Sequence, residues 1–176
     1  MRIFYICLTF IILIGGTSFT QNMDFEEYDP PSTLVVPGKE IKKAKYPFID
    51  VHNHQFGMPD MDLSNLVQDM DQLNMKVMVN LSGRGRGSEE HLKGALENVH
   101  ENYPNRFIVF TNIDFNNIDE SGWTENAVAQ LENDVRLGAH GLKVYKSLGM
   151  HNKDSKGNRV HIDDPRIAPV LSLIHI

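Results

Sequence analysis

Hydrophobic residues recur along the chain in two alternating patterns, short and mostly apolar runs and helical stripes. The mostly apolar runs have strand length and lie at residues 47–51, 76–81, 106–113 and 141–145. Between them, apolar residues recur every three or four positions, which is typical of amphipathic helices. The three stripes consist of Leu63, Leu66, Val67, Met70 and Leu73, of Leu92, Ala95, Leu96 and Val99, and of Ala127, Val128, Leu131 and Val135. Strands that are apolar on both faces and alternate with helices predict an α/β fold with a parallel sheet.

Residues suited to helix ends lie where the stripes begin and stop. Asp62 and Ser88 are expected N-caps of the first two helices, and Gly138 is the expected C-cap of the third. Asp164 followed by Pro165 has the pattern of an N-cap and first residue of a fourth helix. Two architectures fit this order of elements, an open doubly wound sheet and a closed eight-stranded barrel. Periodicity alone does not separate them.

The first 20 residues have the pattern of a secretory signal peptide. A positive start at Met1–Arg2 precedes an apolar run over residues 3–14, which is too short to span a bilayer comfortably. Small residues, Ser18 and Thr20, precede a cut ahead of residue 21. We expect removal of residues 1–20 and export to the periplasm or the medium, without stable membrane insertion. A membrane anchor that stays attached is the alternative.

The rest of the composition is that of an ordinary globular protein. It is 41% hydrophobic and 23% charged, with a net charge of −6 and interleaved signs, so the basic patch that nucleic-acid binders need is not visible. The one cysteine, Cys7, lies in the leader, which excludes a disulfide scaffold. Residues 21–46 are polar and lack periodicity, and they predict a tether before a domain at residues 47–170.

Two histidines at the end of the first strand are the strongest chemical signal. Because side chains alternate along a strand, Asp50, His52 and His54 share one face. Two imidazoles spaced in this way can hold one cation together, and neutral imidazole suits zinc and other first-row divalent ions. The carboxyl end of a strand is also where barrel enzymes keep their chemistry. The pattern predicts a site for a divalent metal, zinc above others; a second ion is implied only by the family resemblance described next. Two surface histidines in a loop are the alternative.

Three runs of the sequence resemble the amidohydrolase superfamily, whose members are metal-dependent (β/α)8-barrel hydrolases. FIDVHNH looks like the first strand of that family, which ends in H-x-H. GLKVYKSLGM resembles the fourth strand, where many members carry a lysine that becomes carboxylated and bridges two metals. GNRVHIDDPRIAPV is similar to the lead into helix four of the amidohydrolase-related branch, which also contains nonoxidative decarboxylases. The resemblance covers roughly residues 48–170 and implies a TIM barrel.

Lys143 is preferred over Lys146 as the metal-bridging lysine that the resemblance implies. Apolar Leu142 and Val144 suit a face packed on helices, so Lys143 points the other way, into the barrel mouth. A buried amine shifts toward its neutral form, which can add carbon dioxide and become an anionic ligand. A lysine paired with a carboxylate in the core is the alternative.

The glycine-rich run at residues 83–87 follows the second strand and carries two arginines. Arg84 and Arg86 are candidates for binding a substrate carboxylate. A mobile solvated loop is the preferred interpretation of this run, and carboxylate binding is the alternative.

The length of the domain is about half of what a closed barrel needs. A (β/α)8 barrel typically takes about 250 residues, whereas residues 47–170 supply four strand–helix units. We therefore expect the truncated N-terminal half of a TIM barrel, with the remaining ligands and the general base outside this chain. Residues 171–176, LSLIHI, match the translation of a sequencing-adapter end and are expected to be foreign. A genuine helix start is the alternative.

These observations predict a fragment of an exported, metal-dependent hydrolase that is inactive by itself. In the full-length parent, a metal-activated water would attack a carbonyl-type centre of a small-molecule substrate. A metal-dependent nonoxidative decarboxylase on the same barrel is one alternative. A non-catalytic exported binding protein is another. The sequence predicts no oligomeric state.

Overall fold

The computed structural model describes residues 26, 28–35, 38 and 40–174, and the chain divides into two units between residues 39 and 40. The described residues of the first unit form no helix or strand. The predicted signal peptide, residues 1–20, lies outside the described residues. None of the helices in the described ranges is long and apolar enough to cross a membrane.

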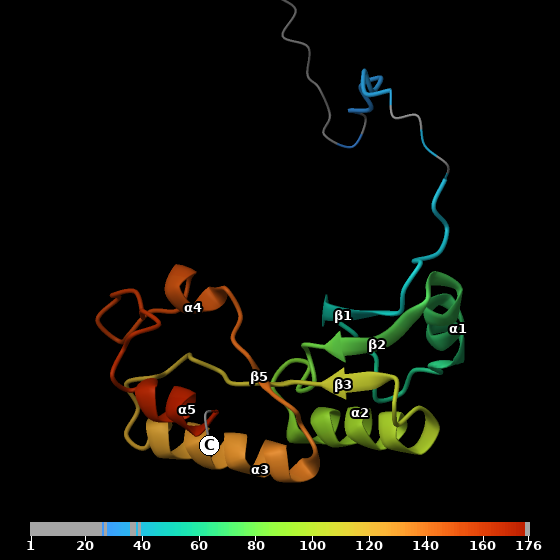
Figure 1. Cartoon of the computed structure of the whole chain (residues 1–176). Coiled ribbons are helices and arrows are strands. Elements are labelled where there is room, and N and C mark those ends of the chain that lie inside the picture. The colour runs from blue at the N-terminus through green and yellow to red at the C-terminus, as the bar shows by residue number, and fades with distance from the viewer. Residues whose placement is uncertain (1–25, 27, 36–37, 39, 175–176) are drawn as a thin grey trace, which may run out of the picture. The chain divides into compact units, whose positions relative to one another are not determined.

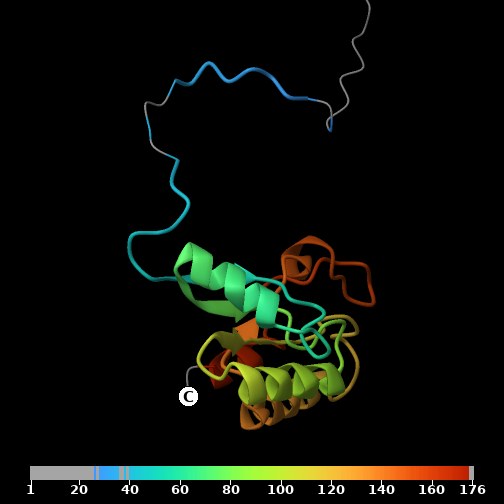
Figure 2. The ribbon, with the colours of Figure 1, turned by 90° about the vertical axis from the view of Figure 1, so that its right-hand side faces the viewer.

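The second unit alternates strands with helices, and its elements are drawn in Figures 1 and 2. In chain order they are β1 (Phe48–Asn53), α1 (Ser64–Leu73), β2 (Met75–Asn80), α2 (Glu89–Asn102), β3 (Phe107–Val109), β4 (Thr111–Asn112), α3 (Trp123–Leu137), β5 (Leu142–Lys143), α4 (Ser147–Met150) and α5 (Ala168–Leu173). The end of the predicted tether is attached to this unit, because Ala44 N–H donates to the Leu73 carbonyl at 3.1 Å.

The strands form two small parallel sheets, β1-β2-β3 and β4-β5. The predicted strand at residues 106–113 is split at Phe110, where the chain changes its pairing partner. Phe110 N–H still donates to the Asn80 carbonyl of β2, while Thr111 N–H donates to the Gly141 carbonyl just before β5. Parallel strands therefore follow one another in chain order, without the reversal that characterises a doubly wound sheet.

The described strands do not close a barrel. The molecule is mixed α/β with small parallel sheets, and the half of a TIM barrel stays a prediction. Residues 171–173 lie in α5, and their foreign origin stays a prediction.

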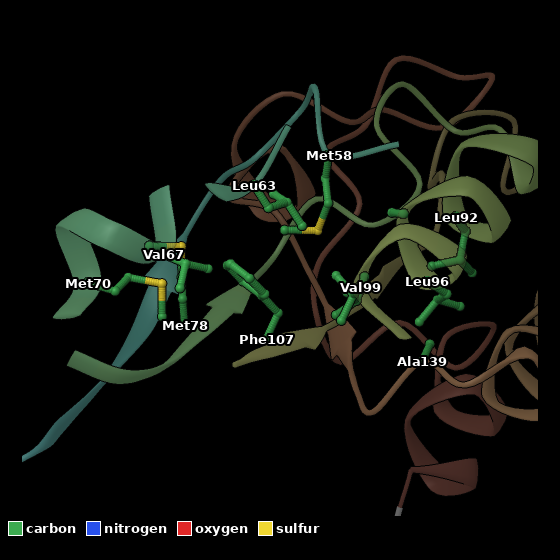
Figure 3. Packing of buried hydrophobic residues seen from close by; sticks show 12 residues of the cluster. Met58, Leu63, Val67, Met70, Met78, Leu92, Leu96, Val99, Phe107 and Ala139 are labelled. Carbon is green, nitrogen blue, oxygen red and sulfur yellow. The ribbon is translucent and has the colours of Figure 1, made fainter. Parts of the chain in front are cut away.

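Two apolar clusters place the helices against the strands. The first joins α1, α2 and the 58–63 loop to β2 and β3, and in Figure 3 the ring of Phe107 lies between Val67 on the α1 side and Val99 on the α2 side. The second cluster joins α3 and α5 to the chain around β4 and β5, and Leu142 and Val144 pack against it. Because side chains alternate along a strand, Lys143 lies on the face of β5 opposite to Leu142 and Val144.

The prediction of a buried first strand is wrong. Ile49 and Val51 are exposed, with relative areas of 54% and 69%. The reason is that β1 is an edge strand paired with β2 alone, and α1 packs on β2 instead.

Two of the four predicted helix ends also need correction. Ser88 caps α2 by accepting from His91 N–H at 3.0 Å, and Gly138 caps α3 with φ of 117°, as expected. The N-cap of α1 is Leu63, although the Asp62 carboxylate accepts from Ser64 N–H. The last helix begins at Ala168 instead of Pro165, because residues 164–167 form a hydrogen-bonded turn.

A buried ion pair connects α3 to the loop after β2. The Arg84 guanidinium donates two hydrogen bonds of 2.7 Å to the Asp134 carboxylate, which is fully buried. The Thr111 hydroxyl of β4 donates to the same carboxylate. This pairing supplies the negative charge and the acceptors that a buried guanidinium requires.

Replacing Asp134 with alanine leaves the Arg84 charge buried and unpaired. We expect the free energy of unfolding in urea to fall by about 3–5 kcal/mol. The matched control is Glu132→Ala on the same helix, whose pair with Arg136 is solvent-exposed and should change stability by less than about 0.5 kcal/mol. Equal effects of the two substitutions would contradict this assignment.

A second ion pair closes the turn before α5. The Arg166 guanidinium donates to both Asp164 oxygens, at 2.8 and 2.6 Å, and also to Asp119 in the loop after β4. The hydrogen bonds from Arg166 lower the pKa of the Asp164 carboxyl to about 2.

This pKa predicts how acid acts on the turn. Because the folded-state pKa lies below the ordinary value of 3.8, the stabilisation by Asp164 is complete above pH 3.8 and is lost as the pH falls through about 2. Asp164→Asn should therefore lower the unfolding midpoint in urea at neutral pH, and the difference from the unmodified chain should shrink across that window. Asp163→Asn, at the exposed neighbour, is the control. A difference that stays constant with pH would refute the prediction.

Candidate metal centre

The carboxyl ends of β1, β2 and β5 bring five polar side chains to one place: His52, His54, Ser82, Lys143 and Tyr145. This convergence follows from parallel pairing, which puts the ends of successive strands at the same edge. His52 lies within β1, and His54 is the first residue after its end at Asn53.

The buried amide of Asn80 fixes the chain around His54. Its side-chain oxygen accepts from the N–H groups of Gln55 and Ser82, both at 3.0 Å, and its Nδ2 donates to the Gln55 carbonyl. Asn80 thereby ties the chain after β1 to the end of β2. Asn80 has no exposed surface, so its partners are held in a setting where an unmade hydrogen bond is costly.

The two imidazoles lie close together at the end of β1. The ring centroids of His52 and His54 are 5.4 Å apart, and the rings are inclined at 68°. The Asp50 carboxylate does not join them, because it accepts from His52 N–H and Asn53 Nδ2. These hydrogen bonds lower the pKa of Asp50 and keep it ionised while it braces the end of the strand.

The ring of His54 is held on several sides. Its Nδ1 lies 2.7 Å from Ser82 Oγ, which lies 2.8 Å from the Tyr145 hydroxyl. Phe56 and Tyr145 stack against the ring, each with a centroid distance of 5.9 Å. Partial burial lowers the pKa of the His54 imidazole, and the charges of His52 and Lys143 lower it further. Neutral imidazole, the form that binds metals, is therefore favoured.

Lys143 is half-buried and faces this group of residues. Its charge acts on His54, and its ammonium forms no ion pair within the described part of the chain. The alternative of a core lysine paired with a carboxylate finds no support in these contacts. Lys146, the less favoured candidate, is exposed at the start of α4.

The two imidazoles fit a shared cation. When two rings each bind a tetrahedral metal through one nitrogen at about 2.1 Å, their centroids lie about 5 Å apart, close to the 5.4 Å observed. His54 has Nε2 available for this role, since Nδ1 is engaged by Ser82. Among the described residues, no cluster of three or more His, Cys, Asp or Glu could complete a site. Lys143 is the neighbouring group with ligand chemistry after carboxylation.

The structure separates the two predicted substrate-binding arginines. Arg86 is exposed and lines a hollow of about 410 Å³ that also reaches Tyr145. Arg84 is 6% exposed and uses three N–H groups on Asp134 and the Gly87 carbonyl. Arg84 therefore has a structural role. Of the two arginines, only Arg86 lines the hollow that reaches Tyr145.

His91, at the start of α2, joins the two loops that border the site. Its Nδ1 lies 2.8 Å from the Gly83 carbonyl and its Nε2 lies 2.7 Å from the Phe56 carbonyl. Because both partners are acceptors, a neutral tautomer makes one of these bonds and the imidazolium makes both. The sequence pattern indicates only a helical surface position for this residue.

Ser82, Tyr145 and Asn80 are parts of the site that pattern reasoning does not identify. The available signal is position, since each lies at the carboxyl end of a predicted strand. Their connection depends on contacts across 63 residues, from Ser82 to Tyr145. Comparison with protein-family models, with curated proteins and with solved structures finds no match for this chain.

Proposed function

We propose that this chain carries the first metal ligands of an exported, metal-dependent hydrolase of the amidohydrolase type. The observation that supports this proposal best is the meeting of His52 and His54 with Lys143 at the carboxyl ends of parallel strands. The order of the strands along the chain agrees with the first half of a barrel. The resemblance of FIDVHNH and GLKVYKSLGM to the first and fourth strands of that family supplies the reaction class.

The described side chains have distinct parts in this proposal. His52 and His54 would hold a divalent cation, with zinc the preferred ion, through neutral ring nitrogens. A cation held there supplies Lewis acidity and lowers the pKa of water that it binds. Lys143, once carboxylated, would add an anionic ligand, and Arg86 would pair with a carboxylate of a small-molecule substrate. The general base is assigned to no residue of this chain.

The burial and charge of the site favour this use over a purely structural one. Two imidazoles and an ammonium lie close together, and the neighbouring Asp50 carboxylate is engaged by the His52 N–H and by Asn53 Nδ2. Partial burial and the charges of His52 and Lys143 lower the pKa of the His54 imidazole, and the unprotonated ring is the ligand form. Export of the mature chain, proposed from residues 1–20, is compatible with the absence of cysteine after Cys7.

Removing both imidazoles tests the proposal directly. His52→Ala combined with His54→Ala should abolish Zn²⁺ uptake in equilibrium dialysis, because no paired nitrogen ligands remain. The matched control is His100→Ala combined with His140→Ala, two histidines that line a separate hollow beside Val77 and Phe107. Unchanged Zn²⁺ content in the first variant would refute the site.

Lys143→Ala separates the hydrolase from the decarboxylase on the same barrel. In bicarbonate buffer, a bridging carboxylated lysine predicts that the full-length parent loses its second metal in this variant. A parent that holds one metal and retains it after the substitution would replace the hydrolase proposal with the decarboxylase.

A further inference from the structure

The hydrogen bonds that run from His54 through Ser82 to Tyr145 have a direction that their chemistry determines. The chain of contacts ends at the Leu81 carbonyl, which lies 3.3 Å from the Tyr145 hydroxyl and also accepts from Asn112 Nδ2 at 2.9 Å. A carbonyl oxygen only accepts, so the hydroxyl proton of Tyr145 is directed at Leu81.

The donors of the Ser82–Tyr145 and His54–Ser82 hydrogen bonds follow from this assignment. With its single proton used on Leu81, the Tyr145 oxygen accepts from Ser82 Oγ at 2.8 Å. Ser82 has then used its own proton, so its oxygen accepts from His54 Nδ1 at 2.7 Å. The proton of the neutral His54 ring therefore lies on Nδ1, and Nε2 keeps a lone pair.

The opposite direction leaves one contact without a proton. If Tyr145 donated to Ser82 and Ser82 donated to His54 Nδ1, the oxygens of Tyr145 and Leu81 would face each other with no hydrogen between them. That arrangement forfeits a hydrogen bond in a half-buried setting. It would also put the proton of His54 on Nε2, the tautomer that free histidine favours.

We propose that Ser82 and Tyr145 are positioning residues that hold His54 in the Nδ1–H tautomer and leave Nε2 unprotonated for a cation shared with His52. The tautomer itself stands on the hydrogen bonds alone, and its use for a metal rests on the proposed function. Metal-binding histidines commonly donate their second nitrogen to a neighbouring acceptor, which sets the ring and raises its affinity for the metal.

The experiment is ¹⁵N NMR of the histidine side chains of the full chain at about pH 8.5, where an ordinary imidazole is neutral. The His54 resonances are assigned by their loss in His54→Gln. The expected spectrum shows His54 with a protonated Nδ1 and an unprotonated Nε2. In Ser82→Ala and in Tyr145→Phe, the population should move to the Nε2–H form. Tyr103→Phe, at the C-cap of α2, is the matched control and should leave His54 unchanged.

Two results would overturn the proposal. One is an Nε2–H tautomer of His54 in the unmodified chain, and the other is an Nδ1–H tautomer that persists in either Ser82→Ala or Tyr145→Phe. Ser82→Thr retains the hydroxyl and should retain the Nδ1–H form. It therefore separates loss of the hydrogen bonds from His54 through Ser82 and Tyr145 to Leu81, called the relay below, from a general disturbance of folding.

Calorimetric titration with Zn²⁺ alone distinguishes this proposal from the proposed function. Loss of the relay should weaken Zn²⁺ binding about tenfold, the lower end for such supporting contacts. If the unmodified chain shows the Nδ1–H tautomer but takes up no Zn²⁺, the proposed function fails while the relay stands. If Zn²⁺ binds equally well with and without the relay, Ser82 and Tyr145 are not positioning residues.

Discussion

Two buried side-chain amides supply the hydrogen bonds that the backbone needs where the parallel strands end, and the geometry of the candidate site depends on them. Asn80 holds Gln55 and Ser82, and Asn112 donates to the carbonyls of Leu81 and Lys143. Strand ends leave backbone groups without ladder partners, and burying such groups unpaired costs free energy. The amides meet this requirement and at the same time fix the distances between neighbouring strand ends.

The relay from His54 to Leu81 is built on that framework. Ser82 is placed by Asn80, and the Leu81 carbonyl at the end of the relay is shared with Asn112. Arg84, two residues further along, fixes the following loop to α3 through Asp134. The glycine-rich run at residues 83–87, which looks like a mobile loop in the sequence, is therefore partly buried. Of its two arginines, only Arg86 is exposed.

Local features of this chain could be predicted from its sequence because they depend on short-range physics. The Ser88 cap and the Gly138 cap follow from neighbouring backbone groups, and the closeness of His52 and His54 follows from alternation along a strand. The burial of Arg84 could not be predicted, because its partner lies 50 residues away. The exposure of β1 could not be predicted either, because an apolar strand carries no information about which elements cover it.

Charge explains why the site is suited to ligand binding although its ligand set is incomplete in the described residues. Partial burial and the charges of His52 and Lys143 lower the pKa of the His54 imidazole, so the neutral form of this ring is favoured. A neutral ring offers its lone pair to a cation, and the neighbouring Asp50 carboxylate lies beside His52 at the end of the same strand. We propose on this basis that the two imidazoles act together on one cation.

Titration of the ¹⁵N-labelled chain with Zn²⁺ tests that claim most directly, with the Nε2 resonance of His54 and the ring resonances of His52 followed together. We expect both rings to respond in parallel to the same bound ion, while the rings of His100 and His140 do not respond. A response of only one of the two rings, or of neither, would contradict it.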